Sequence, residues 1–437
     1  MTARRSIRVP QALTRERAAS LAASPVIRGT AFLYGSTITT SVLGFFFWFV
    51  AARLLTPEEV GAGSAAQSAA QLCATIGILG LGTLTIAELA TDRSKVRQLV
   101  SATCLVAAIA STAAGVVTGV VLTHTSRHLD AVVGGWLPLT TFALLAGTTA
   151  AGLVLDDACI GLLRGEIQLV RNAVFAAAKL ALLPVAIYAG GFGHGRQIIV
   201  VWLLASAGSL VVAYGLIRRR TEPATWRPDL SNLIAKRRLI WSHHLLNVAV
   251  LAPGLAAPVV VTTLVGPSAN AGFYTALLVT NFVNIIPSQL ATTFFALAPG
   301  DEAALAREIR ITLRVSVAVS VAAAVLFGFG SHLILHVFRR SYVSAAPAMA
   351  LLGFATFPYA IKSHFVGITR VQGRMQRGAA FAALAAIIEI VGAVIGTSLD
   401  NVTGAAAGLL TALVFESLLF GPTVLSALRG QQPSAST

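Results

Sequence analysis

The sequence predicts an all-α integral membrane protein with about twelve transmembrane helices, arranged as two parallel six-helix repeats around a central cleft. Two observations support this fold class: charged residues are few and clustered, and the two halves of the chain repeat each other. Hydrophobic residues make up 56% of the 437 residues and charged residues 11%, whereas soluble domains carry about 25% charged residues. So few charges cannot cover a water-facing surface, which excludes a soluble enzyme.

Long uncharged stretches predict the individual spans. The longest runs from 239 to 300 without Asp, Glu, Lys or Arg. A helix crosses a bilayer with about 20 apolar residues, so this stretch holds two spans. The chain lacks the alternation of outer-membrane strands. The expected helices are 29–52, 61–88, 98–123, 135–161, 171–190, 197–218, 240–264, 272–299, 313–337, 344–368, 378–398 and 403–427.

The distribution of Lys and Arg predicts the orientation in the membrane. With twelve spans and the N-terminus inside, 25 of the 32 Lys and Arg fall on the cytoplasmic side and five outside. This bias predicts that both termini are cytoplasmic. The expected domains are a basic tail 1–28, an N-terminal lobe 29–218, a basic linker 219–239, a C-terminal lobe 240–428 and a tail 429–437. The net charge of +15 is then explained by contacts with anionic lipids, and nucleic acid is not an expected partner.

The two halves of the chain match at nearly constant spacing. At an offset of 210 residues, Arg28 falls on Arg238, Gly44 on Gly254, and Pro57 on Pro267. At an offset of 206, Arg164 falls on Arg370 and Arg171 on Arg377. Six spans is an even number, so both copies start on the same side. This predicts a parallel repeat about an axis along the membrane normal, with a substrate cleft between the lobes.

Two segments resemble a known family. The segment 52–61 (Ala-Arg-Leu-Leu-Thr-Pro-Glu-Glu-Val-Gly) closes the first expected span and opens the second, and 161–165 (Gly-Leu-Leu-Arg-Gly), followed by Arg171, joins the fourth span to the fifth. Both resemble the polysaccharide-export, Wzx-like flippases of the multidrug/oligosaccharidyl-lipid/polysaccharide superfamily, which also includes the MATE exporters. The resemblance extends from about Arg28 to Arg429.

This resemblance implies a function. The expected activity is translocation of a polyprenyl-pyrophosphate-linked oligosaccharide across the cytoplasmic membrane of a bacterium by alternating access, for polysaccharide biosynthesis. The expected partners are membrane lipids and the lipid-linked sugar, with polysaccharide-assembly enzymes as further candidates. The alternative on the same fold is an ion-coupled antiporter of drugs or small cations. A basic cleft would favour the first function and buried acids the second.

The resemblance also implies that helices one, two, seven and eight line the cleft. The candidate substrate-binding residues there carry amide, hydroxyl and imidazole groups, which suit the neutral hydrogen bonds that a sugar needs. They are Tyr34, Gln67, Gln71, His244, Asn247, Asn281 and Asn284. Arg28 and Arg238 begin the first helix of each lobe, where guanidinium groups suit a pyrophosphate. The alternative for both arginines is an anchor that only sets topology.

Five of the ionisable residues inside expected spans are candidates for buried ion pairs or ion coupling, since a charge in the membrane needs a partner or a function. Counting residues from Arg164 and Arg171 places Asp156 and Lys179 at equal depth, which predicts an ion pair between them. In the second half, Lys362 lies eight residues before Arg370 and Glu389 twelve after Arg377, one helical turn deeper, which predicts that Lys362 approaches Glu389. Such pairs are either structural or part of a proton relay or phosphate site. Glu416 has no evident partner, so it is either neutral in the membrane or takes up a coupling ion.

The sequence contains no motif for catalysis or for a cofactor. It has no GxSxG, P-loop, HExxH or CxxC pattern, and the adjacent His243 and His244 do not share a helix face as metal ligands would. We therefore expect no enzymatic activity, no metal and no cofactor. Any energy input would come from an ion gradient or from the substrate gradient.

Overall fold

The computed structural model describes residues 25–91, 96–191, 193–220, 237–296 and 302–430. No β-strand occurs among them. The helices are α2 (Pro25–Leu54), α3 (Pro57–Gly77), α4 (Leu81–Thr91), α5 (Val96–Thr125), α6 (Arg127–Val133), α7 (Trp136–Gly161), α8 (Gly165–Tyr188), α9 (Arg196–Arg220), α11 (Arg237–Leu264), α12 (Pro267–Thr292), η1 (Thr293–Ala296), α13 (Glu302–Phe338), η2 (Arg340–Ala345), α14 (Ala346–Val371) and α15 (Met375–Leu428).

The predicted membrane fold is confirmed, and the number of spans is close to the expected twelve. Ten helices of the described chain are long and apolar enough to cross a bilayer, and α3 with α4 forms one further broken span, bent by 51°. The bend was not predicted from the sequence, which indicated one helix over 61–88. Leu79 and Gly80 both adopt left-handed backbone angles, with φ of 52° and 76°, and this interrupts the helix.

The helix α15 is two spans. Its 54 residues would measure about 81 Å as one straight helix, far more than a bilayer needs. Asp400 and Asn401 have non-helical backbone angles, so the chain turns back between 399 and 402. The two arms then pack backbone to backbone, because a Cβ on Gly396 would lie 1.9 Å from the carbonyl oxygen of Gly404. The break restores the twelfth expected span.

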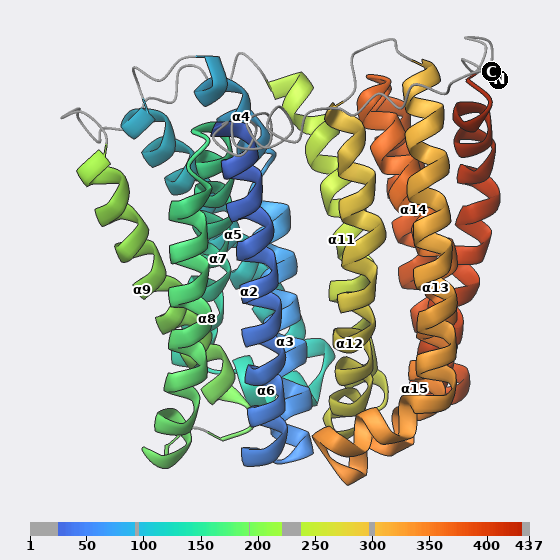
Figure 1. Cartoon of the computed structure of the whole chain (residues 1–437). Helices are drawn as coiled ribbons and strands as arrows, with labels where there is room; N and C mark the ends of the chain where they lie inside the picture. Colours follow the sequence, from blue (N-terminus) through green and yellow to red (C-terminus); the bar gives the residue numbers. More distant parts are fainter. Residues whose placement is uncertain (1–24, 92–95, 192, 221–236, 297–301, 431–437) are drawn as a thin grey trace, which may run out of the picture.

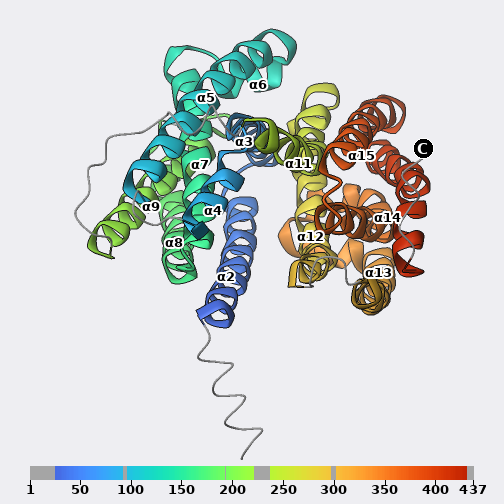
Figure 2. The same ribbon diagram turned by 90° about the horizontal axis from the view of Figure 1, so that it is seen from above.

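The helices form two groups that lie side by side (Figures 1 and 2), with α2 to α9 on one side and α11 to α15 on the other. The described contacts between the groups are made mainly by α3 with α11 and α12. We call the end where α2 begins the basic end. It includes the turns 162–164 and 372–374 and the described residues Arg97, Arg164, Arg218, Arg219, Arg370 and Arg374.

The residues between α2 and α3 form a cap at the start of α3. Thr56 caps α3 by accepting a hydrogen bond from the amide of Glu59, and Glu59 accepts one from the amide of Thr56 at 2.9 Å. This is a capping box, and Pro57 at the first helical position has no amide hydrogen to leave unpaired. Glu59 also accepts a hydrogen bond from Gln197 of α9 at 2.9 Å. The segment thus fixes α3 against α9.

Both halves use the same turn before their fifth span, at a single offset of 210 residues. The amide of Arg164 donates to the carbonyl of Cys159 at 2.8 Å, and the amide of Arg374 donates to that of Thr369 at 3.1 Å. Leu163 and Gly373 hold the same place in the two turns, with φ of 57° and 69°. The offset of 206 inferred for this region was therefore wrong by four residues, one helical turn, a shift that an Ala-rich helix tolerates without losing its pattern.

The two groups meet at the end opposite the basic end, which we call the closed end. The guanidinium of Arg53, on α2, donates to the carbonyl of Val337 in α13 at 2.5 Å, while Arg339 donates to the carbonyl of Ala52 at 3.0 Å and also to that of Leu55. Gly61 of α3 lies so close to α12 that a Cβ there would be 1.7 Å from the carbonyl oxygen of Pro267.

Candidate functional site

A cavity of about 560 Å³ lies between the two groups of helices. This volume is in the range of small-molecule binding pockets. Residues of α2, α3, α8 and α9 line it from one side, and residues of α11, α12, α14 and α15 from the other. Aromatic rings separate the cavity from the closed end: Trp48 lies 4.6 Å from Tyr274 and 6.3 Å from Trp202, between ring centroids.

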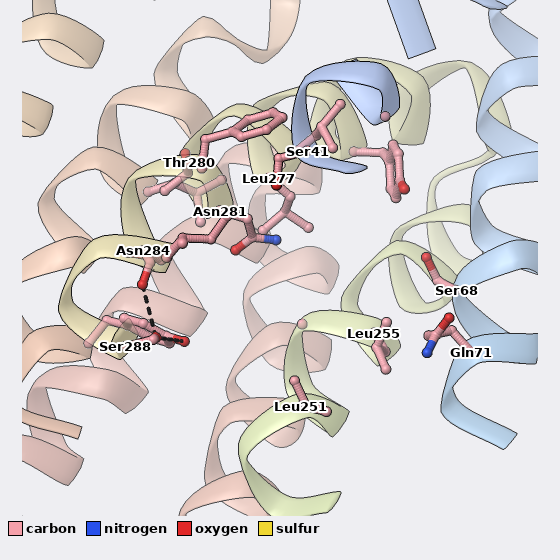
Figure 3. A pocket seen from close by; sticks show the side chains of 18 of the residues that line it. Ser41, Ser68, Gln71, Leu251, Leu255, Leu277, Thr280, Asn281, Asn284 and Ser288 are labelled. Carbon is pink, nitrogen blue, oxygen red and sulfur yellow. Dashed lines mark hydrogen bonds between the residues drawn. The ribbon is translucent and has the colours of Figure 1, made fainter. Parts of the chain in front are cut away.

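Neutral hydrogen-bonding groups cover much of the cavity wall. Figure 3 shows Ser68 and Gln71 of α3 facing Asn281 and Asn284 of α12 across the space. The side-chain oxygen of Asn284 is buried without a partner in the structure. The hydroxyl and amide residues of the wall are Thr37, Thr40, Ser41, Gln67, Ser68, Gln71, Tyr274, Thr280, Asn281, Asn284, Ser288, Gln289 and Tyr359. Such a wall can hydrogen-bond a polar, uncharged ligand group at many points.

Lys179 brings an amino group to this wall. Its side chain is buried in α8, and its Nζ lies 4.2 Å from the ring centroid of Trp202, 4.9 Å from that of Phe175 and 5.2 Å from that of Phe47. The electron-rich ring faces stabilise the ammonium group. No ion pair of Lys179 occurs within the described part of the chain, so its charge is available to an anionic ligand.

A second ionic group lies on the other side of the cavity. Lys362 of α14 is in contact with Glu389, and its Nζ is 3.3 Å from Oε2 of Glu416. All three side chains are buried, Glu416 completely. Lys362 and Glu389 line the cavity and Glu416 lies behind them. Two carboxyl groups share one ammonium group, so the cluster has room for one further positive charge, such as a proton.

Lys179 and Glu389 are equivalent residues of the two halves. The offset of 210 defined by the turns places Lys179 on Glu389, and both line the cavity. The same offset places Lys362 on Gly152. A Cβ on Gly152 would lie 2.8 Å from Nη1 of Arg171, so the guanidinium fills the space of a side chain there. The cavity residue Glu389 therefore has an ion-pair partner in its own half, whereas the equivalent Lys179 has none in the described structure.

The expected ion pair between Asp156 and Lys179 does not form. Asp156 instead accepts two hydrogen bonds from Arg171, at 2.8 Å and 2.5 Å, and one from Asn172 at 3.3 Å. The depth count assumed that the fifth span begins at Arg171, but α8 begins at Gly165. Arg171 is consequently level with Asp156, and Lys179 lies deeper, about 21 Å along α8.

The remaining predicted residues are placed as follows. Gln67, Gln71, Asn281 and Asn284 line the cavity. His244 is buried beside Trp241, with ring centroids 5.6 Å apart, and is not part of the wall. Asn247 accepts a hydrogen bond from Arg370 at 2.6 Å. The side chains of Arg28, Tyr34 and Arg238 lie outside the described part of the structure.

Sequence reasoning missed several wall residues. The sequence does not distinguish Trp48, Trp202 and Tyr359 from other aromatic residues of the spans. The structure shows that they come from α2, α9 and α14 and line the same cavity. Arg370 read as a loop residue that sets topology, but it belongs to α14, which continues to Val371. The equivalence of Lys179 and Glu389 was hidden by the wrong offset, and the spacing of Arg164 and Arg374 could have revealed it.

Structural comparison identifies the fold class. The chain resembles an inward-facing MATE-family multidrug transporter of the MOP superfamily (TM-score 0.66, 14% identity, 91% of this chain and 96% of that chain). It also resembles the lipid II flippase MurJ in an inward closed conformation (TM-score 0.67, 10% identity, 91% and 90%) and a eukaryotic MATE transporter (TM-score 0.61, 14% identity, 93% and 98%).

The chain thus has the fold of the MOP superfamily transporters. At these identities the likeness defines the fold and leaves the substrate open. No protein-family profile and no curated protein sequence matches the chain.

Proposed function

We propose that the protein translocates a polyprenyl-pyrophosphate-linked oligosaccharide across the bacterial cytoplasmic membrane by alternating access of two six-helix lobes, 29–218 and 240–428. The observation that carries the proposal is the charge of the cavity. Lys179 lines it without an ion-pair partner in the described structure, whereas the carboxylate of Glu389 is bound to Lys362. This arrangement favours a ligand that carries negative charge.

The neutral part of the cavity wall agrees with a sugar head group. Asn281, Asn284, Gln67 and Gln71 supply donors and acceptors from both lobes, and a sugar can use many such bonds without a counter-charge. The contacts of Arg53 and Arg339 close one end. In our proposal the basic end faces the cytoplasm and receives the substrate there, with Arg28 and Arg238 as further candidates for the pyrophosphate.

The second candidate function is ion-coupled export of a drug or small cation. It is favoured by one observation: Glu389 and Glu416 outnumber the single ammonium group of Lys362 beside the cavity. In the flippase proposal these residues have a different role, as the place where a coupling proton binds. The two functions differ in the sign of the charge that the transported molecule carries.

The test is translocation by the purified protein in vesicles. Wild-type protein should move a lipid-linked oligosaccharide between leaflets, and Lys179→Glu should abolish this, since it places a carboxylate where the pyrophosphate binds. Arg314→Gln is a matched control, because Arg314 is exposed on α13 and is not a cavity residue. Equal rates for wild type and Lys179→Glu would contradict the proposal.

A further inference from the structure

A smaller cavity of about 190 Å³ continues the main one within the C-terminal group of helices. The two cavities share Val250, Ser288, Tyr359 and Lys362. The smaller cavity extends to Arg370, one residue before the end of α14. The smaller cavity therefore connects the main cavity to the part of α14 that lies at the basic end.

Arg370 presents a cation to this smaller cavity with a neutral partner. Its Nη2 donates to the side-chain oxygen of Asn247 in α11 at 2.6 Å, and its Nε is buried without an acceptor. A guanidinium carries five N–H donors, so most remain for a ligand. A residue that served only to set topology would extend its charge into water or lipid head groups rather than into a cavity.

The other groups around the cavity are compatible with an anion. Ser288, Thr292, Tyr359 and Ser363 contribute hydroxyl groups. The second cation, Lys362, is held by Glu389 and Glu416 on its far side. No carboxylate of the described chain lines the smaller cavity. In this structure the hydroxyl groups of Ser288, Thr292 and Ser363 donate to main-chain carbonyl groups. An anion in the smaller cavity would therefore meet one uncompensated positive charge, together with hydroxyl groups that must rotate to donate to it.

We propose that Arg370 and the hydroxyl groups of the smaller cavity bind the phosphate groups of a lipid-linked substrate on its way from the basic end to the main cavity. This inference rests on the proposed function and adds a second cationic position to it. A planar guanidinium binds phosphate oxygens in pairs, which an ammonium cannot do. Lys179, deeper in the molecule, would receive the head group later.

Binding of farnesyl pyrophosphate to the purified full chain in detergent tests this site directly. Arg370→Gln should weaken binding about 10-fold or more, the effect of one lost hydrogen bond to a charged group. Asn247→Asp is the sharper variant, because it keeps the hydrogen bond to Arg370 but adds a carboxylate that balances the guanidinium charge. It should weaken binding as much as Arg370→Gln does. Arg370→Lys should restore part of the affinity. The control is Arg164→Gln, which replaces an exposed arginine in the N-terminal group, in the turn equivalent to the one that follows α14. This variant should bind as wild type does.

The outcomes separate this site from the proposed function. Unchanged affinity in both Arg370→Gln and Asn247→Asp would overturn the site, even if wild-type protein translocates the lipid-linked sugar. Inorganic pyrophosphate binding as tightly as the farnesyl compound would overturn the assignment to a lipid-linked ligand. If wild-type protein binds farnesyl pyrophosphate through Arg370 but moves no lipid-linked sugar in vesicles, the site stands and the proposed function fails.

Discussion

Lys179 and Glu389 occupy equivalent positions in the two halves of the chain and carry opposite charges into the same cavity. Glu389 is bound to Lys362, while Lys179 is surrounded by aromatic rings. The difference follows from the neighbouring span: Lys362 in one half corresponds to Gly152 in the other. Equivalent positions of the two halves thus carry opposite charges, and only Glu389 has an ion-pair partner in the described structure. The proposal of an anionic substrate is based on this difference.

The aromatic surroundings of Lys179 should stabilise its charged form measurably. In a double-mutant cycle, Trp202→Leu and Lys179→Met should couple by about 0.5–2 kcal/mol in the free energy of unfolding, because the ring stabilises the cation only while the ammonium is present. Thermal unfolding in detergent gives the four values. Trp241→Leu, far from Lys179, should show no coupling. Strict additivity at Trp202 would mean that the amine is neutral or points elsewhere.

Removing Lys362 should be strongly destabilising. Lys362→Met leaves Glu389 and Glu416 buried beside each other without a counter-charge, which should cost about 3–5 kcal/mol. Adding Glu389→Gln and Glu416→Gln to the same chain should recover most of this loss, because no charge then remains buried. The measurement is the unfolding midpoint of the single and triple variants. A triple variant as unstable as the single one would show that packing, rather than charge, is lost.

The closed end should loosen when its arginines are replaced. Arg53 and Arg339 each donate to carbonyl groups near the end of a helix in the opposite group, where the helix dipole adds to the attraction. The double variant Arg53→Gln/Arg339→Gln should shift the population toward longer distances between spin labels at Leu54 and Leu264, measured in a background without Cys73, Cys104 and Cys159.

The control is Arg127→Gln, which replaces an exposed arginine at the same end and should leave the distance distribution unchanged. No shift in the double variant would show that the hydrogen bonds of Arg53 and Arg339 do not hold this end closed.

Gly61 should control the same end by contact alone. Gly61→Ala places a methyl group 1.7 Å from the carbonyl oxygen of Pro267, so α3 and α12 must separate. The Leu54–Leu264 distance should lengthen, and the protein should lose stability. Gly254→Ala is the control, since nothing lies within 4 Å of its Cβ position. Similar behaviour of the two variants would show that the close approach has no consequence.

The spans were predictable from the sequence because bilayer thickness fixes helix length and charge is excluded from the apolar core. The boundaries were less so. The interruption at Leu79 and Gly80 leaves no gap in hydrophobicity, and the start of α8 at Gly165 precedes the first residues that read as membrane-embedded. Because α8 begins six residues before Arg171, Arg171 rather than Lys179 lies at the level of Asp156.

The candidate site was predictable only in part. Gln67, Gln71, Asn281 and Asn284 were expected at the cavity because the family resemblance implies that helices one, two, seven and eight line it, and because amide groups suit a sugar. Trp202 and Arg370 were not, since an aromatic residue in a span and an arginine at its end are both ordinary there. Their significance depends on which helices α9 and α14 pack against, and that is a property of the tertiary structure.

The most direct test of the account is the charge preference of transport by wild-type protein in one vesicle preparation. The vesicles contain a polyprenyl-pyrophosphate-linked oligosaccharide in the membrane and a cationic dye in the external buffer, with proton and sodium gradients imposed in turn. We predict movement of the lipid-linked sugar between leaflets and no accumulation of the dye. Gradient-driven accumulation of the dye, with the lipid-linked sugar immobile, would contradict the account and identify an exporter of cations.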